Sequence, residues 1–339
     1  MNFGMQKAVR ILMIFAVLFT FAQCKVNRAG EDEKNQNTSA APAEKKNYRI
    51  GIIYFGPDEA ADLCMKGLFD GLKDLGFVEG QNLEIKKAHA QAEIANIPLL
   101  FQNYDSMQLD AIIPMSTPCL TAACTTVKNT PVVFTYVYDP VAAGAGKDAN
   151  DHLPFVTGTS SFPPVEDTVA MIRKITPDVK AVGTIYNPSE ANSVKVMEVA
   201  RPIFDKAGIK LEEVTINGTS DVYPAMQAVA SRDVQALWVT GDNTALQAFD
   251  GVGKAAADAK LPLYINDPEF TNRGALIAVG ISWYRTGYVS AKKLAQVLKG
   301  EDPAKIPFES YVEKKLQLNH DVAKQLGITF PEDILKEAP

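Results

Sequence analysis

The sequence predicts an α/β protein with two doubly wound parallel-sheet domains, and three observations support this fold class. The chain has 339 residues, which suggests about two domains at ~150 residues each. Short β-branched and aromatic runs alternate with helical patterns, as they do in βαβ units. The alternation starts at Tyr48 and again at Lys180, so we expect two domains of similar topology, with a chain that crosses between them more than once.

The first 23 residues have the pattern of a secretory signal peptide. Lys7 and Arg10 precede an apolar run over residues 11–22, and no Asp or Glu occurs before Glu31. A helix over this run would be about 18 Å long, too short for the ~30 Å hydrocarbon core of a bilayer. Cys24 follows a Phe-Ala-Gln segment that resembles a bacterial lipobox, so we expect a lipid on Cys24, with simple cleavage nearby as the alternative.

Residues 24–47 are expected to form a lipidated, flexible tether. After Cys24 this segment contains Val26 as its one large aliphatic residue and no aromatic residue. Because so little apolar surface is available for burial, the segment is not expected to order itself.

Four strand-like runs form the first series, at residues 48–55, 83–90, 110–116 and 131–138. The apolar residues between the first two runs repeat at helical spacing before the stop at Gly76: Ala61, Met65, Leu68, Leu72 and Leu75. A segment rich in Gly, Pro and polar residues follows at 141–164 and is the expected first crossover.

The second series repeats the pattern with strand-like runs at 181–188, 211–216, 236–242 and 261–267. A helix is expected from about Ser189 to Ala207, closed by Gly208, and another follows Trp283 and ends at Gly300. We therefore expect a first lobe over residues 48–157 and 281–307, and a second over 158–280 and 308–339.

Composition and motifs argue against several functional classes. The balance of 34 Lys and Arg against 40 Asp and Glu gives a net charge of −6, which disfavours nucleic acid as a partner. Neither a phosphate-binding loop nor a Gly-x-Ser-x-Gly elbow is present. His89, His152 and His320 are far apart in sequence, and Cys119 and Cys124 are out of step on a helix. We expect no enzyme activity, no metal and no cofactor.

Candidate ligand-binding residues follow from the rule that open parallel sheets bind ligands beyond the carboxyl ends of their strands. Polar and aromatic side chains are frequent at those strand ends and at two expected crossovers, residues 157–161 and 280–284. The candidates are Tyr54, Phe55, Ser116, Thr117, Ser160, Ser161, Asn187, Glu190, Asn192, Ser193, Asp242 and Trp283. Several of them, notably Asn187 and Asp242, are also residues that cap helices. Asp139 and Asp267 precede prolines and are interpreted first as turn formers.

A set of segments over about residues 48–330 resembles the ABC-transporter substrate-binding proteins of the tryptophan-receptor type. The most specific are YNPSEANS at 186–193 and the helix that contains Tyr-x-x-Gly and ends in Leu-Lys-Gly-Glu at 298–301. The resemblance implies a type I periplasmic-binding-protein fold, with two lobes on a multi-stranded hinge and a ligand that is an amino acid, often aromatic.

An amino acid needs three kinds of partner in such a pocket. Its carboxylate needs hydroxyls and helix N-termini, which Ser116, Thr117, Ser160 and Ser161 could supply. Its ammonium needs a carboxylate, for which Asp242 is our first choice and Glu190 the second. A large side chain needs stacking surfaces, for which the candidates are Tyr54, Phe55, Trp283 and Tyr284.

These features together predict an exported receptor, lipid-anchored at the membrane surface, that closes on its ligand and presents it to an ABC permease and its ATPase. We expect a monomer. A sensory receptor on the same fold and a sugar-binding receptor stay open as alternatives. A sugar-repressor type of regulator is disfavoured because an export signal stands where its DNA-binding head would be.

Overall fold

The computed structural model describes residues 47–338. The predicted signal peptide, Cys24 and nearly all of the predicted tether therefore lie outside the described residues. No helix within residues 47–338 is long and apolar enough to cross a membrane.

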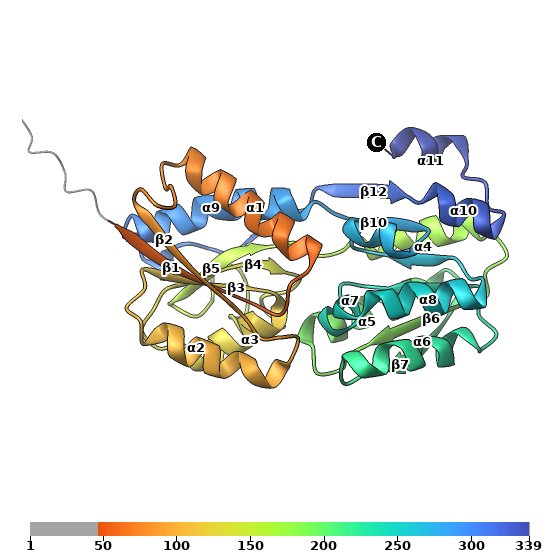
Figure 1. Cartoon of the computed structure of the whole chain (residues 1–339), viewed down its shortest axis with the longest axis horizontal. Helices are drawn as coiled ribbons and strands as arrows, with labels where there is room; N and C mark the ends of the chain where they lie inside the picture. The colour runs from red at the N-terminus through yellow and green to blue at the C-terminus, as the bar shows by residue number, and fades with distance from the viewer. Residues whose placement is uncertain (1–46, 339) are drawn as a thin grey trace, which may run out of the picture. The chain divides into compact units, whose positions relative to one another are not determined.

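The first sheet has six parallel strands in the order β11-β5-β4-β3-β1-β2. Helices α1 and α9 lie on one face of it, and α2 and α3 lie on the other (Figure 1). The strands are β1 (Tyr48–Tyr54), β2 (Leu83–His89), β3 (Ala111–Met115), β4 (Val132–Val137), β5 (Val156–Ser160) and β11 (Glu309–Ser310). The helices are α1 (Glu59–Asp74), α2 (Ile97–Asp105), α3 (Thr117–Thr126) and α9 (Trp283–Leu298), with the short 3₁₀ helices η1 (Ile94–Asn96) and η4 (Pro303–Lys305). We call this unit the first lobe.

The second sheet has six strands in the order β12-β10-β9-β8-β6-β7, and only the β10–β12 pair is antiparallel. The strands are β6 (Ala181–Tyr186), β7 (Lys210–Thr215), β8 (Ala236–Val239), β9 (Leu263–Ile265), β10 (Ile277–Ile281) and β12 (Lys314–Leu318). The helices are α4 (Val165–Ile175), α5 (Ala191–Lys206), α6 (Val222–Ala230), α7 (Asn243–Gln247), α8 (Phe249–Ala259), α10 (His320–Leu326) and α11 (Glu332–Glu337), with η2 (Thr219–Asp221) and η3 (Pro268–Arg273). This unit is the second lobe.

The chain passes between the two sheets three times. The crossings are residues 161–164 after β5, residue 282 after β10, and residues 311–313 after β11. This architecture confirms the predicted fold class of two α/β lobes joined by several chain segments. The first sheet includes β5 as far as Ser160 and the two-residue strand β11, which pairs with β5.

Helices α1 and α9 pack with their backbones in close approach. A Cβ atom added at Gly67 would lie 1.9 Å from the carbonyl oxygen of Tyr284, and one added at Gly287 would lie 2.0 Å from that of Cys64. Of the apolar stripe predicted from Ala61 to Leu75, the residues up to Leu72 are buried, whereas Leu75 lies at the end of the helix and is 41% exposed. Gly76, at φ +87, ends the turn after α1. The close packing fixes the N-terminal end of α9, and with it Trp283, against the first lobe.

Candidate functional site

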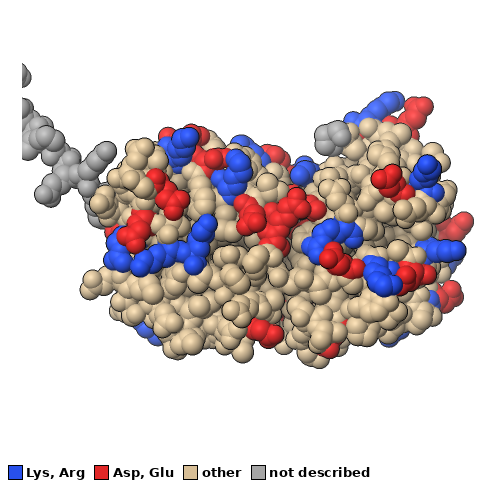
Figure 2. All heavy atoms as spheres, viewed as in Figure 1, with Lys and Arg blue, Asp and Glu red and all other residues tan. Residues whose placement is uncertain are grey.

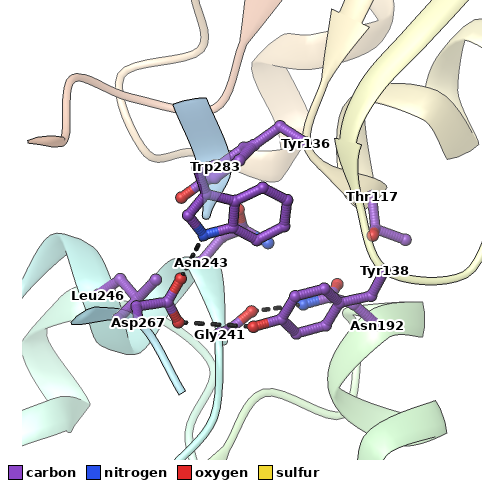
Figure 3. A pocket seen from close by; sticks show the side chains of 9 residues that line it. All are labelled: Thr117, Tyr136, Tyr138, Asn192, Gly241, Asn243, Leu246, Asp267 and Trp283. Atoms are coloured by element: carbon purple, nitrogen blue, oxygen red, sulfur yellow. Dashed lines mark hydrogen bonds between the residues drawn. The ribbon is translucent and has the colours of Figure 1, made fainter. Parts of the chain in front are cut away.

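A small cavity lies between the lobes, where the carboxyl ends of strands from both sheets meet. Its volume is about 10 Å³, which is room for about one water molecule. Figure 3 shows the side chains around it, which follow β3, β6, β8, β9 and β10 or lie at the end of β4. They are Thr117, Tyr136, Tyr138, Asn192, Gly241, Asn243, Leu246, Asp267 and Trp283.

Three aromatic rings form one wall of the cavity. The Tyr136 and Trp283 rings meet edge to face with centroids 4.4 Å apart, and the Tyr138 and Trp283 planes are 15° apart with centroids at 5.8 Å. The register of β4 shifts between Phe134 and Val137, and Tyr136 has a φ of +59. A β-bulge of this kind re-aims side chains, and strained backbone of this kind clusters at functional sites.

Asp267 is the acidic side chain of the cavity. Its Oδ1 accepts a hydrogen bond from Trp283 Nε1 at 2.7 Å, and its Oδ2 lies 3.5 Å from the Tyr138 hydroxyl (Figure 3). The residue is 1% exposed. The pKa of Asp267 is raised to about 7, chiefly by burial; the hydrogen bond from Trp283 lowers this pKa, and the nearby charges of Glu269 and Asp58 raise it. A buried carboxylate with such a pKa is a natural partner for a cation.

Helix N-termini also converge on the cavity. Thr117 begins α3, Trp283 begins α9, and Asn192 lies in the first turn of α5. The Asn192 amide is 2% exposed, and its Nδ2 donates to the carbonyl of Gly241 at 2.8 Å. Its Oδ1 is buried with no hydrogen-bond partner among the residues that the structure describes. A buried, unpaired amide oxygen beside a helix N-terminus is available to a polar ligand.

The two carboxylates favoured from sequence for the ammonium group are occupied within the second lobe. Asp242 caps α7 and accepts hydrogen bonds from Asn187 N at 2.7 Å, Ser193 Oγ at 2.6 Å and Ala245 N at 2.8 Å. Glu190 accepts from Asn243 and Thr244, through the backbone N–H and the side chain of each. Burial raises the pKa of both carboxyls. Neither carboxylate lines the cavity.

Three of the predicted residues, Thr117, Asn192 and Trp283, line the cavity, and the other nine do not. Ser116 caps α3 in a strained conformation at φ +106, and Asn187 donates to Thr244 at 3.0 Å within the Asp242 network. The half-buried ring of Tyr54 lies against His89 with the two ring planes tilted by 49°, while Phe55 is buried in the core of the first lobe. The remaining two lie at the first crossing: the Ser160 hydroxyl is 3.4 Å from the carbonyl of Glu309, and the buried Ser161 hydroxyl has no partner among the described side chains.

Six of the nine cavity residues lie outside the predicted set, among them Gly241 and Leu246. Tyr136, Tyr138 and Asn243 were not among the candidates, although Tyr138 ends an aromatic-rich strand run and Asn243 follows Asp242 directly. Asp267 was interpreted as a turn former because it precedes Pro268. The signal that could have identified Asp267 is its place directly after the buried strand β9.

Several known proteins are similar to this chain over most of its length. A curated relative, the tyrosine-binding protein of Clostridioides difficile strain R20291, is 29% identical over 299 residues, which is 88% of this chain and 86% of that protein. The structure of a domain from Streptococcus pneumoniae in complex with L-Trp is 30% identical, with a TM-score of 0.83 over 86% of this chain and 99% of that one.

The arrangement of the lobes can be compared with a second solved structure. The ligand-free, open structure of a substrate-binding protein from Clostridium difficile is 27% identical, and it covers 86% of this chain and 98% of its own, but its TM-score is 0.65. Identity and coverage are similar for the two structures, and the TM-score is lower for the ligand-free, open one.

The family model described as ABC transporter substrate binding protein matches residues 49–339. Proteins of this kind are solute receptors and not enzymes, and those of ABC importers act outside the cytoplasm. This chain belongs to the family of ABC transporter substrate-binding proteins.

Proposed function

We propose that this receptor binds an aromatic amino acid in the cavity between its lobes. The observation that carries the proposal is the cavity lining itself. Three aromatic rings form one wall of it, beside a buried carboxylate and the ends of helices. The C. difficile relative is named for tyrosine and the S. pneumoniae structure holds L-Trp, which supports a ligand of this class.

The polar groups suit the two ends of a zwitterion. The ammonium donates to Asp267 and to the unpaired Oδ1 of Asn192, both of which accept hydrogen bonds. The carboxylate accepts from the Thr117 hydroxyl and from free N–H groups at the starts of α3 and α5. The aromatic ring packs against Trp283 and the two tyrosines.

Binding requires the lobes or the aromatic side chains to move. The cavity volume of about 10 Å³ is far below the roughly 300 Å³ of small-molecule sites. Tyr138 comes from the first lobe and contacts Asp267 and Gly241 of the second lobe. Its side chain therefore occupies volume that the ring of a ligand would need. The ligand enters an open form, contacts both lobes, and favours the closed form by its differential affinity for it. An ABC permease with its ATPase then recognises the closed, monomeric receptor.

Isothermal titration calorimetry of the purified protein tests the ligand class. The panel contains the twenty amino acids, glucose, ribose and a short peptide. We expect one site that binds Trp, Tyr or Phe at least tenfold more tightly than aliphatic amino acids. Binding of a sugar without binding of any amino acid would replace this proposal with the sugar-receptor alternative.

The amino-terminal assignments form a separate part of the proposal. We assign residues 1–23 to a signal peptide, Cys24 to lipid attachment and residues 24–47 to a tether that keeps the receptor at the membrane surface. A single acyl chain binds membranes weakly, so stable anchoring needs more than one chain. Mass spectrometry of the protein from membranes should find acyl chains on Cys24, and Cys24→Ala should release the receptor into the soluble fraction.

A further inference from the structure

The residues that line the cavity favour a positively charged group over a negatively charged one. Among the described residues that line it, Asp267 is the one charged side chain, and no Lys or Arg is present. A cation in the cavity therefore meets a buried carboxyl whose ionised form it favours. An anion meets only hydroxyls and helix N-termini, which carry about half of an elementary charge each.

More carboxylates surround Asp267 on both sides of the cleft. Asp58, the N-cap of α1 in the first lobe, accepts a hydrogen bond from the Tyr136 hydroxyl at 3.2 Å. Glu269 of η3 in the second lobe is 7% exposed, and its Oε2 has no hydrogen-bond partner among the described residues. The charges of Asp58 and Glu269 both act on Asp267. Figure 2 shows acidic side chains gathered on this face around the N-terminal end of α1.

Basic side chains on the neighbouring elements β12, α9 and α1 pair with carboxylates. Lys315 of β12 lies 3.4 Å from Glu269 Oε1. Arg285, in the first turn of α9, pairs with Glu313, and Lys66 of α1 pairs with Asp70. A ligand ammonium would therefore bring positive charge to Asp267, which meets no Lys or Arg among the described residues that line the cavity.

We propose that the ammonium group is the obligatory recognition element of the ligand and that its carboxylate is dispensable, so that aromatic monoamines are ligands as well as aromatic amino acids. This inference rests on the proposed function of the same cavity. Loss of the carboxylate removes hydrogen bonds from the Thr117 hydroxyl and from helix N-termini that carry only partial charges, and we expect this loss to raise Kd by up to about 30-fold. Loss of the amine leaves Asp267 buried without its cation, which corresponds to about 100-fold or more.

Two matched sets of three ligands test the proposal by calorimetry at pH 7.5. The first set is L-tryptophan, tryptamine and indole-3-propionate, and the second is L-tyrosine, tyramine and 3-(4-hydroxyphenyl)propionate. Within each set the ring is constant and only the charged ends change. We expect the amine to bind within about 30-fold of the amino acid, and the acid to bind at least 100-fold more weakly.

The outcomes separate this inference from the proposed function. If an amino acid binds and its amine does not, or its acid binds as well as its amine, the inference is wrong and the proposed function stands. If none of the six binds, the proposed function fails and the inference fails with it.

A charge-neutral variant tests whether Asp267 is the residue that binds the ammonium group of the ligand. Asp267→Asn keeps an acceptor for Trp283 and removes the charge, so the preference for tryptamine over indole-3-propionate should fall by at least about tenfold. Asp178→Asn, an exposed aspartate between α4 and β6, makes the same charge change away from the cavity and should leave the preference unchanged. An unchanged preference in Asp267→Asn would overturn the assignment.

Discussion

Asp267 gives the receptor a pH dependence whose sign follows from its environment. Burial raises its pKa to about 7 in the free protein, while a bound ammonium favours the ionised form, so ligand binding displaces a proton. The affinity should therefore fall as the pH drops through 7, by up to about 25-fold in Kd between pH 7.5 and 5.5. Calorimetry at the two pH values, each in two buffers of different ionisation enthalpy, measures both the Kd and the released proton.

The same pKa shift has the opposite consequence for the unliganded fold. Between the usual pKa of 3.8 and about 7, the native state binds more protons at Asp267 than the unfolded state does. This contribution to stability is therefore present at low pH and is lost as the pH rises to 7. In Asp267→Asn both effects should disappear, whereas a Kd that stays pH-dependent in this variant would place the titrating group elsewhere.

Asp242 is expected to act on stability rather than on ligand charge. Asp242→Ala removes the partner of two buried backbone N–H groups and of the Ser193 hydroxyl, and should lower the free energy of unfolding by about 3 kcal/mol. Urea unfolding followed by tryptophan fluorescence measures this loss. In Asp267→Asn the loss should be below about 1 kcal/mol because the contact to Trp283 is kept. If the Asp242→Ala variant is as stable as the original protein but no longer binds the ligand, Asp242 is a ligand-binding residue after all.

The contrast between Asp242 and Asp267 also shows what sequence can tell about single residues. Both follow a buried strand, so position alone does not separate a helix cap from a ligand partner. The decision depends on which backbone N–H groups reach each carboxylate in three dimensions. Tyr136 is not predicted for a related reason. Its orientation depends on a β-bulge and a positive φ, and neither can be predicted from a run of β-branched and aromatic residues.

At the scale of elements, the contact between α1 and α9 depends on two glycines. In Gly67→Ala the new Cβ would lie 1.9 Å from a backbone carbonyl of α9, so the helices have to separate. We expect a loss of about 2 kcal/mol or more in unfolding free energy, together with weaker ligand binding, because Trp283 begins α9. Gly218→Ala is the matched control, since nothing lies within 4 Å of its added Cβ. Equal stability of the two variants would contradict this account.

Elements with strong periodicity could be predicted from the sequence, and short ones could not. The strands of both series and the long helices α1, α5 and α9 follow from alternation, apolar stripes and glycine stops. Strand β11 has two residues, and it exists because the chain returns beside β5 between the second and third crossings. Such a strand depends on tertiary pairing, which leaves no periodic signal in so short a segment.

At the scale of the whole receptor, binding is expected to depend on contacts between the lobes that never touch the ligand. Gly56 follows β1 in the first lobe, and Gln247 ends α7 in the second. The Gln247 side chain donates to the carbonyl of Pro57 at 3.3 Å. A Cβ atom added at Gly56 would lie 2.7 Å from Gln247 Oε1. Neither residue lines the cavity, so this contact reports on closure alone.

Gly56→Leu should act as a wedge that holds the lobes apart. If the ligand stabilises the closed form by contacts to both lobes, a receptor that cannot close retains only the contacts of one lobe and loses affinity by the cost imposed on closure. We expect Kd to rise at least tenfold, and the ligand-induced decrease in radius of gyration, measured by small-angle X-ray scattering, to disappear. Gly218→Leu, with open space at its Cβ, controls for the added side chain. Full affinity in Gly56→Leu without compaction would show that one lobe suffices for binding, and closure would then serve only recognition by the permease.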